Sequence, residues 1–156
     1  MRNPDVAGPI SAIDQRASMK LGFTAVDEDH ERLLSLASEV EGLILSREPA
    51  HRVRAKFQEL VEYSLAHFSR EEAHMEACRY PGLTAHRREH QELAEWLVHI
   101  EKALAEDGIQ AHAAATDQTI AFFRAWIERH LRSFDKAAVQ FIASAADAAA
   151  NVPLRG

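Results

Sequence analysis

Apolar residues recur at three- and four-residue steps along four successive segments of this 156-residue chain. In the first segment the repeat comprises Val26, His30, Leu33, Leu34, Ala37, Val40 and Ile44. This period is that of an amphipathic helix, and no segment shows the strict alternation of a half-buried strand. The sequence therefore predicts an all-α protein.

Turn signals divide this helical pattern into segments of similar length. Glu48-Pro49, the YPG of residues 80–82 and Asp107-Gly108 each interrupt the repeat. Long helices joined by short links favour an antiparallel up-down-up-down four-helix bundle.

The two ends of the chain differ from the predicted bundle. Residues 1–25 have no sustained helical period and are predicted to form an N-terminal arm. The bundle is expected to span residues 26–149, including a short alanine-rich C-terminal helix, and residues 150–156 to form a loose tail. The SFD of residues 133–135 is expected to break the chain before that last helix, with Ser133 or Asp135 as its cap.

The composition restricts the class of function. A formal net charge of -6 argues against nucleic acid as a partner, because nucleic-acid binding needs a basic face. The single cysteine, Cys78, excludes a disulfide framework within the chain and a cysteine-based zinc finger. No run approaches the ~20 apolar residues of a membrane span, and the first residues lack the apolar run of a signal peptide. We therefore expect a cytoplasmic protein without membrane insertion.

Nine histidines are the unusual feature of the composition. Five of them and one glutamate continue an apolar repeat toward the predicted inside of the bundle: His30, His67, Glu71, His86, His90 and His130. One inward histidine is usually a hydrogen-bonded packing residue. Six inward polar residues would leave many buried atoms without partners, at roughly 1–3 kcal/mol for each. A cation satisfies them together, and imidazole with carboxylate is a ligand set for iron, zinc, copper or nickel.

The same residues fall at one level of an antiparallel bundle. His30 lies near the start of the first helix and His67 near the end of the second. His86 and His90 open the third helix, and His130 closes the fourth. Asp135 follows His130 by five residues, which separates the two by about 140° on a straight helix. The expected break would let Asp135 turn back beside His130, so capping and site roles are compatible.

Four stretches together resemble the hemerythrin family, specifically its bacteriohemerythrin group. They are GFTAVDEDHERL (22–33), HFSREEAHM (67–75), YPGLTAHRREH (80–90) and WIERHLRSFD (126–135). One HxxxE or HxxxH alone would be weak evidence. Five histidines, one glutamate and one aspartate in the family's order are specific.

The resemblance implies two iron ions joined by a bridging oxo or hydroxo group. Their ligands would be His86, His90 and His130 on one iron, His30 and His67 on the other, and Glu71 and Asp135 as bridges. The iron with two histidines would keep an open position, where hemerythrins bind dioxygen. The apolar residues that match the family's oxygen pocket are Leu33, Phe68, Trp126, Ile127 and Leu131, which equally suit ordinary core packing.

The remaining histidines and the cysteine are not expected to bind metal. His74 lies on the inner stripe of the second helix and is interpreted as a core histidine. A role as a hydrogen-bond donor to the metal ligands, or as an extra ligand, is less favoured. His51 and His99 point away from the ligand face of their helices. His112 shares the face of His130 but lies ~27 Å from it along the helix. Cys78 is interpreted as a packing residue.

Three functions stay open at this point. The first is reversible oxygen binding for storage, delivery or sensing, and the lack of an attached signalling domain favours a free carrier. The second is a di-iron redox enzyme: a peroxidase, an oxidase or a protein that handles nitric oxide. The third is a bundle that binds zinc or no metal, although seven convergent ligands exceed the four that zinc prefers. We expect a binder rather than an enzyme, because a site dominated by neutral imidazoles favours highly oxidised iron less than a four-carboxylate site does.

Overall fold

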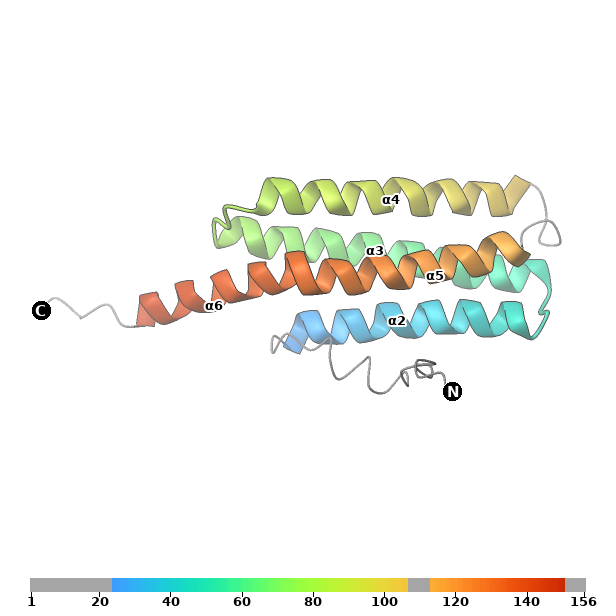
Figure 1. Cartoon of the computed structure of the whole chain (residues 1–156), viewed down its shortest axis with the longest axis horizontal. Helices are drawn as coiled ribbons and strands as arrows, with labels where there is room; N and C mark the ends of the chain where they lie inside the picture. The colour runs from blue at the N-terminus through green and yellow to red at the C-terminus, as the bar shows by residue number, and fades with distance from the viewer. Residues whose placement is uncertain (1–23, 107–112, 151–156) are drawn as a thin grey trace, which may run out of the picture.

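The computed structural model describes residues 24–106 and 113–150, with side chains left undescribed at 106, 113–117 and 148–150. Four long helices run alternately up and down beside one another (Figure 1): α2 (Thr24–Leu45), α3 (Ala50–Ala77), α4 (Leu83–Glu106) and α5 (Ala113–His130). The predicted all-α, up-down-up-down bundle is confirmed. The predicted arm lies almost wholly outside the described residues, as do Asp107-Gly108 and most of the predicted tail.

The first two helices end with the same backbone motif. Arg47 and Arg79 each adopt a left-handed conformation just beyond α2 and α3, with φ of 53° and 55°. The next residue then donates back into the helix: the Glu48 N–H to the Leu43 carbonyl at 2.9 Å, and the Tyr80 N–H to the Met75 carbonyl at 2.9 Å. Such caps satisfy the last free carbonyls of a helix and reverse the chain within a few residues. The links are therefore short, and neighbouring helices are antiparallel.

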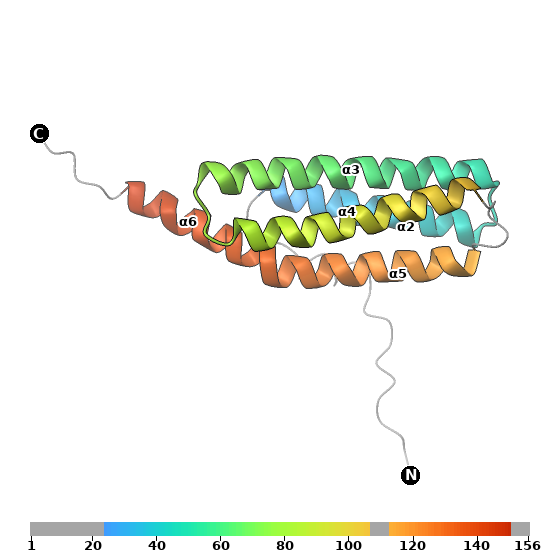
Figure 2. The same ribbon diagram turned by 90° about the horizontal axis from the view of Figure 1, so that it is seen from above.

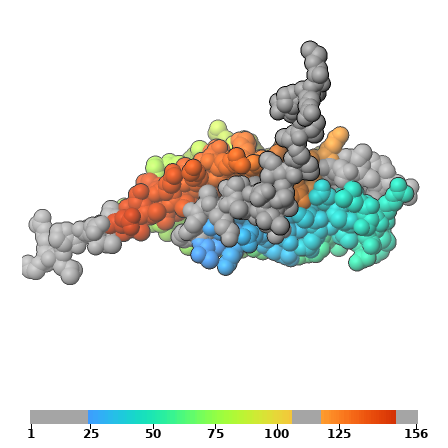
Figure 3. Space-filling view, turned by 60° about the horizontal axis from the view of Figure 1, so that its bottom comes forward, coloured from blue at the N-terminus to red at the C-terminus, as the bar shows by residue number. Residues whose placement is uncertain are grey.

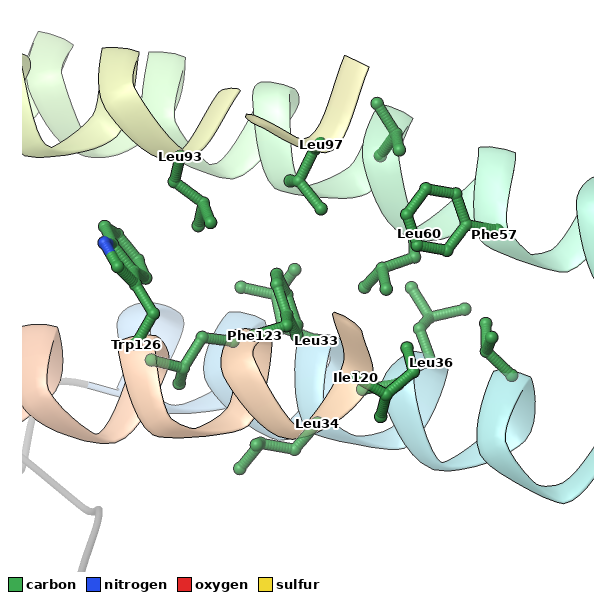
Figure 4. Close-up of a cluster of buried hydrophobic side chains, with 14 of the residues drawn as sticks. Leu33, Leu34, Leu36, Phe57, Leu60, Leu93, Leu97, Ile120, Phe123 and Trp126 are labelled. Atoms are coloured by element: carbon green, nitrogen blue, oxygen red, sulfur yellow. The ribbon is translucent and has the colours of Figure 1, made fainter. Parts of the chain in front are cut away.

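The apolar core fills the bundle between these helices. Figure 4 shows side chains from all four helices meeting there. Phe57, Leu60, Leu97 and Ile120 are buried almost completely, and burying such a side chain contributes roughly 1.5–3 kcal/mol. This core fixes the rotation of each helix about its own axis. The polar residues that continue the same stripes toward one end must then point inward too. Among the described helices, none is long and apolar enough to cross a membrane.

The helix does not break at residues 133–135, so that prediction was wrong. After α5 comes the π-helical turn η2 (Leu131–Asp135), which leads directly into α6 (Lys136–Ala150). The Lys136 N–H donates to the Leu131 carbonyl, five residues back. A π-helical turn adds one residue to a turn without ending the helix. Figures 1 and 2 show α6 continuing the line of α5 past the end of the bundle, and in Figure 3 the coloured surface tapers along α6.

The predicted inner position of His74 on α3 was also wrong. His74 is exposed, and Met75 is buried at 1% relative exposure. A strict seven-residue repeat drifts by about 20° per heptad around a straight helix. Counted from Val53, three heptads place His74 about 60° behind the starting direction, whereas Met75 lies about 40° ahead of it. The inward stripe therefore passes from Glu71 to Met75.

Candidate metal centre

Seven buried side chains meet at the end of the bundle where α2 and α4 begin and α3 and α5 end. They are His30, His67, Glu71, His86, His90, His130 and Asp135, and each is 5% exposed or less. Their ligand atoms form two groups that share Glu71. One group contains Glu71, Asp135 and three histidines, and the other contains Glu71 with His30 and His67. The structure thus brings together every residue expected at the site.

The three-histidine group is arranged as a triangle of nitrogen atoms. The Nε2 atoms of His86, His90 and His130 lie 3.1 Å from one another in all three pairs. Neighbouring ligands at right angles, on metal–nitrogen bonds of about 2.1 Å, would be about 3.0 Å apart. A tetrahedral angle would separate them by about 3.4 Å at the same bond length. The triangle therefore suits one face of an octahedral ion better than a tetrahedral zinc site.

Asp135 lies between the two groups and turns one oxygen toward each. Its Oδ1 lies 3.0 Å from the Nε2 of His130 and 3.1 Å from that of His86. Its Oδ2 lies 3.1 Å from the Nε2 of His30. The π-helical turn explains this position. Because the turn contains an extra residue, Asp135 returns to the helix face of His130, five residues before it.

Glu71 makes the second link between the groups. Its Oε2 lies 3.3 Å from the Nε2 atoms of His86 and His90 and 3.7 Å from that of His67. Glu71 follows His67 by four residues on α3, a spacing that places both on one face of the helix. Two carboxylates therefore span the groups, one from α3 and one from the end of η2.

Several buried polar atoms at this site have no hydrogen-bond partner within the described residues. They are both ring nitrogens of His30, the Nδ1 atoms of His86 and His130, and both carboxylate oxygens of Asp135. The Asp135 oxygens have imidazole nitrogens nearby but not in hydrogen-bonding geometry. Leaving such atoms unpaired costs roughly 1–3 kcal/mol each. A cation bound there would satisfy the Nε2 of His30 and both oxygens of Asp135 together, because these atoms lie about 3 Å from one another or from the Nε2 atoms of the other histidines. The residues present therefore fit a metal ion, although a metal held through Nε2 would leave the Nδ1 atoms unpaired.

The charges of the site follow from its burial and its close pairs. Burial works to raise the pKa of Asp135, but the imidazoles of His130, His30 and His86 hold it well below its usual range. Burial also opposes ionisation of Glu71, and contacts with His86 and His90 lower its pKa to about 2. Both carboxylates are therefore anionic at neutral pH, which is the state that binds a cation.

The pKa values of His86 and His130 shift in opposite directions, because the balance between burial and the nearby carboxylates differs at the two residues. Burial disfavours the charged form of His86, yet Asp135 and Glu71 outweigh it and raise the pKa of His86 to about 9 in the metal-free chain. For His130, burial dominates and lowers the pKa. Trp126 and Phe134 both stack on the His130 ring, with interplanar angles of 12° and 11°. These rings fix the orientation of the imidazole.

A carboxylate that the sequence did not single out supports His67. The Nδ1 of His67 lies 3.1 Å from the Oδ2 of Asp29. Asp29 also accepts hydrogen bonds from the Tyr63 hydroxyl at 2.7 Å and from Arg70 at 2.9 Å. Burial opposes this charge, but the three partners lower the pKa of Asp29 well below its usual range. A hydrogen bond of this kind orients a metal-bound histidine and increases its basicity.

Glu72 supports His90 in the same way. Its Oε1 lies 2.8 Å from the Nδ1 of His90, and its Oε2 accepts from the Nε of Arg87 at 3.2 Å. The adjacent glutamates of the EEAH stretch thus have different positions. Glu71 lies between the two groups of ligand atoms, and Glu72 contacts the opposite ring nitrogen of His90. Helical phase in the sequence identified Glu71 as inward, but it gave no signal for the contact between Glu72 and His90.

A small apolar cavity lies beside the site. Its volume is about 10 Å³, close to the least that one water molecule requires. All five predicted pocket residues line it: Leu33, Phe68, Trp126, Ile127 and Leu131. The sequence analysis missed Ser64, Leu93 and Phe123, which also line it. Of the seven site residues the cavity touches His30, His67, His130 and Asp135, but not His86, His90 or Glu71.

The other histidines described by the structure lie outside the site. His51, His74 and His99 are exposed, and Cys78 is half-buried at the end of α3. His112 lies outside the described residues. The expectation that His51 and His99 point away from the site agrees with their exposure.

A four-helix bundle with two linked clusters of buried histidines and carboxylates defines a metal-binding helical-bundle protein. The comparison with known families specifies it further. Residues 21–142 match the Hemerythrin family, described as the hemerythrin HHE cation binding domain, and the chain belongs to this family.

Similar proteins carry a name from the same family. A bacteriohemerythrin of Stenotrophomonas maltophilia (strain R551-3) is 27% identical over 121 residues, which cover 76% of this chain and 74% of that protein. Bacteriohemerythrins of Pseudomonas aeruginosa strains LESB58 and UCBPP-PA14 are 25% identical over 121 residues, 75% of this chain and 72% of theirs.

Proposed function

We propose that this chain holds two iron ions joined by an oxo or hydroxo group and binds dioxygen reversibly. His86, His90 and His130 would hold one iron, His30 and His67 the other, and Glu71 and Asp135 would bridge the pair. When bound, the iron would supply the electrons that reversible dioxygen binding requires. The chain's own residues position that iron, surround the ligand and exclude water.

The observation that carries this proposal is the position of the apolar cavity. The two groups of ligands are unequal, since one has three histidines and the other two. The cavity borders both histidines of the smaller group and only one of the larger. A metal held by the smaller group would therefore face a space suited to a small neutral molecule. This is the arrangement that an oxygen binder needs.

The lining of the cavity favours binding over further chemistry. Apart from the proposed ligands, Ser64 is the one hydroxyl among the described residues that line it. The Ser64 hydroxyl donates to the Leu60 carbonyl at 2.7 Å, within its own helix. No general acid is thus aimed into the cavity from the described side chains, and the protonation that oxygen cleavage requires has no donor there. The proposed function is therefore that of a binder rather than of a peroxidase or an oxidase.

Metal analysis of matched histidine variants tests the ligand assignment. His67→Ala should reduce iron below two per chain, because it removes one of the two histidines of the smaller group of proposed ligands. His74→Ala changes an exposed histidine on the same helix and should keep two irons. If folded His67→Ala retained two irons, the assignment would be wrong. If the wild-type chain took up zinc alone, the proposal of a di-iron protein would fail.

A further inference from the structure

A groove lies on the surface between α3 and α4, next to the proposed metal centre. Its volume is about 360 Å³, and its walls include Leu65, Phe68 and Ala94. Leu65 is 40% exposed, so the groove opens to solvent. Arg87 and Glu72 on its rim are paired at 3.2 Å. The groove is thus partly apolar, and these two charges on its rim cancel.

Phe68 separates this groove from the buried cavity. It lines both spaces, and it is the one residue common to the two linings. Its ring stacks on the imidazole of His90, with the ring centres 4.1 Å apart and the planes 15° from parallel. The side chain is 6% exposed. A single aromatic ring therefore stands between solvent and the cavity at this point.

The other walls of the cavity are less suited to opening. Leu33, Ile127 and Leu131 are 2–3% exposed and belong to the same apolar core as Phe68, but they do not line the groove. Moving one of them would displace neighbours packed at the density of a protein interior. The Phe68 ring instead has the groove on its outer side, with space to receive it. Rotation of the ring about its side-chain torsions leaves the backbone of α3 in place.

We propose that Phe68 is a gate, and that dioxygen enters the cavity from the α3–α4 groove when this ring turns outward. The inference rests on the proposed function and adds the route of the ligand to it. A neutral diatomic molecule fits the route, because Leu65, Phe68 and Ala94 offer it apolar surface and the cavity beyond is apolar. The gate sets the rate of entry and exit, whereas the cavity and the metal set the affinity.

Rates of oxygen binding and release distinguish a gate, which changes the rates, from the cavity and metal, which change the affinity. Ala94→Phe fills the groove without touching the cavity, since Ala94 lines only the groove. In the iron-loaded chain, stopped-flow association and dissociation rates should both fall several-fold, with an unchanged equilibrium constant. Ala55→Phe places the same side chain at an exposed position of α3 outside both spaces and should change neither rate. Equal rates in Ala94→Phe and Ala55→Phe would overturn the gate.

A second measurement needs no iron. The chain has two tryptophans, and Trp126 lines the cavity. In a Trp96→Phe background, dioxygen quenching of Trp126 phosphorescence reports how often oxygen reaches the cavity. The metal-free chain serves for this, with a zinc-loaded sample and circular dichroism to control for folding. Phe68→Ala should raise the quenching constant, and Ala94→Phe should lower it.

The oxygen-binding kinetics and the phosphorescence quenching can contradict the proposed function and the gate separately. A wild-type chain that does not bind oxygen reversibly would contradict the proposed function, while the quenching series would still report the route. Quenching that is the same in Ala94→Phe, Phe68→Ala and the parent would contradict the gate, whatever the iron-loaded chain does.

Discussion

His130 and Asp135 stand five residues apart, yet the Nε2 of His130 lies 3.0 Å from the Oδ1 of Asp135. The π-helical turn between them produces this contact. Its extra residue per turn brings Asp135 back to the helix face on which His130 lies. The same carboxylate reaches the Nε2 of His30 with its other oxygen, at 3.1 Å. One backbone irregularity thus connects the two halves of the candidate metal centre.

Asp135→Asn should remove this connection. The amide is neutral and offers one oxygen in place of two, so it cannot face both groups as a carboxylate does. We expect fewer than two irons per chain by metal analysis and no oxygen-dependent visible band. Ser133→Ala, at an exposed position of the same turn, should retain both. Two tightly held irons in Asp135→Asn would show that Asp135 is not a bridge.

The adjacent glutamates should give different results. Glu71→Gln changes a proposed bridging ligand and should lower the number of bound irons. Glu72→Gln changes the partner of the His90 Nδ1 and of Arg87 but no proposed ligand, so two irons should still bind, with affinity about 10–100-fold weaker. Competition with a chelator of known affinity measures both. Equal losses in the two variants would contradict the separate roles that the geometry gives them.

Ile127→Glu should accelerate autoxidation. Ile127 lines the apolar cavity and is 3% exposed, so a carboxyl there would bring water and charge to the bound oxygen. The rate is read from the decay of the oxygenated spectrum in air. Ala125→Glu places the same group at an exposed position of α5 and should decay like the parent. An unchanged rate in Ile127→Glu would remove Ile127 from the oxygen pocket.

The stability of the metal-free chain should fall as pH rises from 6.5 to 9. The pKa of His86 is raised from 6.5 to about 9 in the folded chain, since Asp135 and Glu71 outweigh the effect of burial. Its protonated form therefore stabilises the fold fully below pH 6.5, and this contribution is lost as pH rises through 9. The lowered pKa of His130 acts below this window. Urea unfolding at pH 6.5, 7.5 and 9 measures the trend.

Metal binding should show the opposite pH dependence. A metal ion competes with the proton on His86, so its affinity should increase from pH 6.5 to 9, with release of a proton at neutral pH. His86→Gln supplies the control for stability, because its metal-free form should lose the decline between pH 6.5 and 9. A parent and a His86→Gln variant with the same pH profile would show that His86 is not charged in the metal-free fold.

Much of this architecture could be predicted from helical periodicity. The repeat of Leu33, Phe57, Leu93 and Phe123 fixes which face of each helix is inward, and the histidines continue those faces. Short links make neighbouring helices antiparallel, which places the histidines at one end of the bundle. For the same reason the sequence could predict which residues converge, though not how their atoms are arranged.

The misses have physical reasons. The letters SFD carry no residue signature of a π-helical turn, so a break was the simpler prediction. His74 lies near the end of a 28-residue helix, where the drift of the repeat has had most length to accumulate. Asp29 and Glu72 resemble ordinary surface charges until two helices are packed together. Their roles depend on contacts between α2 and α3 and between α3 and α4.

The central claim is that this chain holds two irons and binds dioxygen reversibly at one of them. The most direct test is a visible absorption spectrum with metal analysis of the same sample. The protein is reduced without oxygen, exposed to air, and then freed of oxygen again. We predict two irons per chain and a charge-transfer band that appears in air and disappears when oxygen is removed, over repeated cycles. Two irons oxidised irreversibly in the first cycle, or a chain without iron, would contradict it.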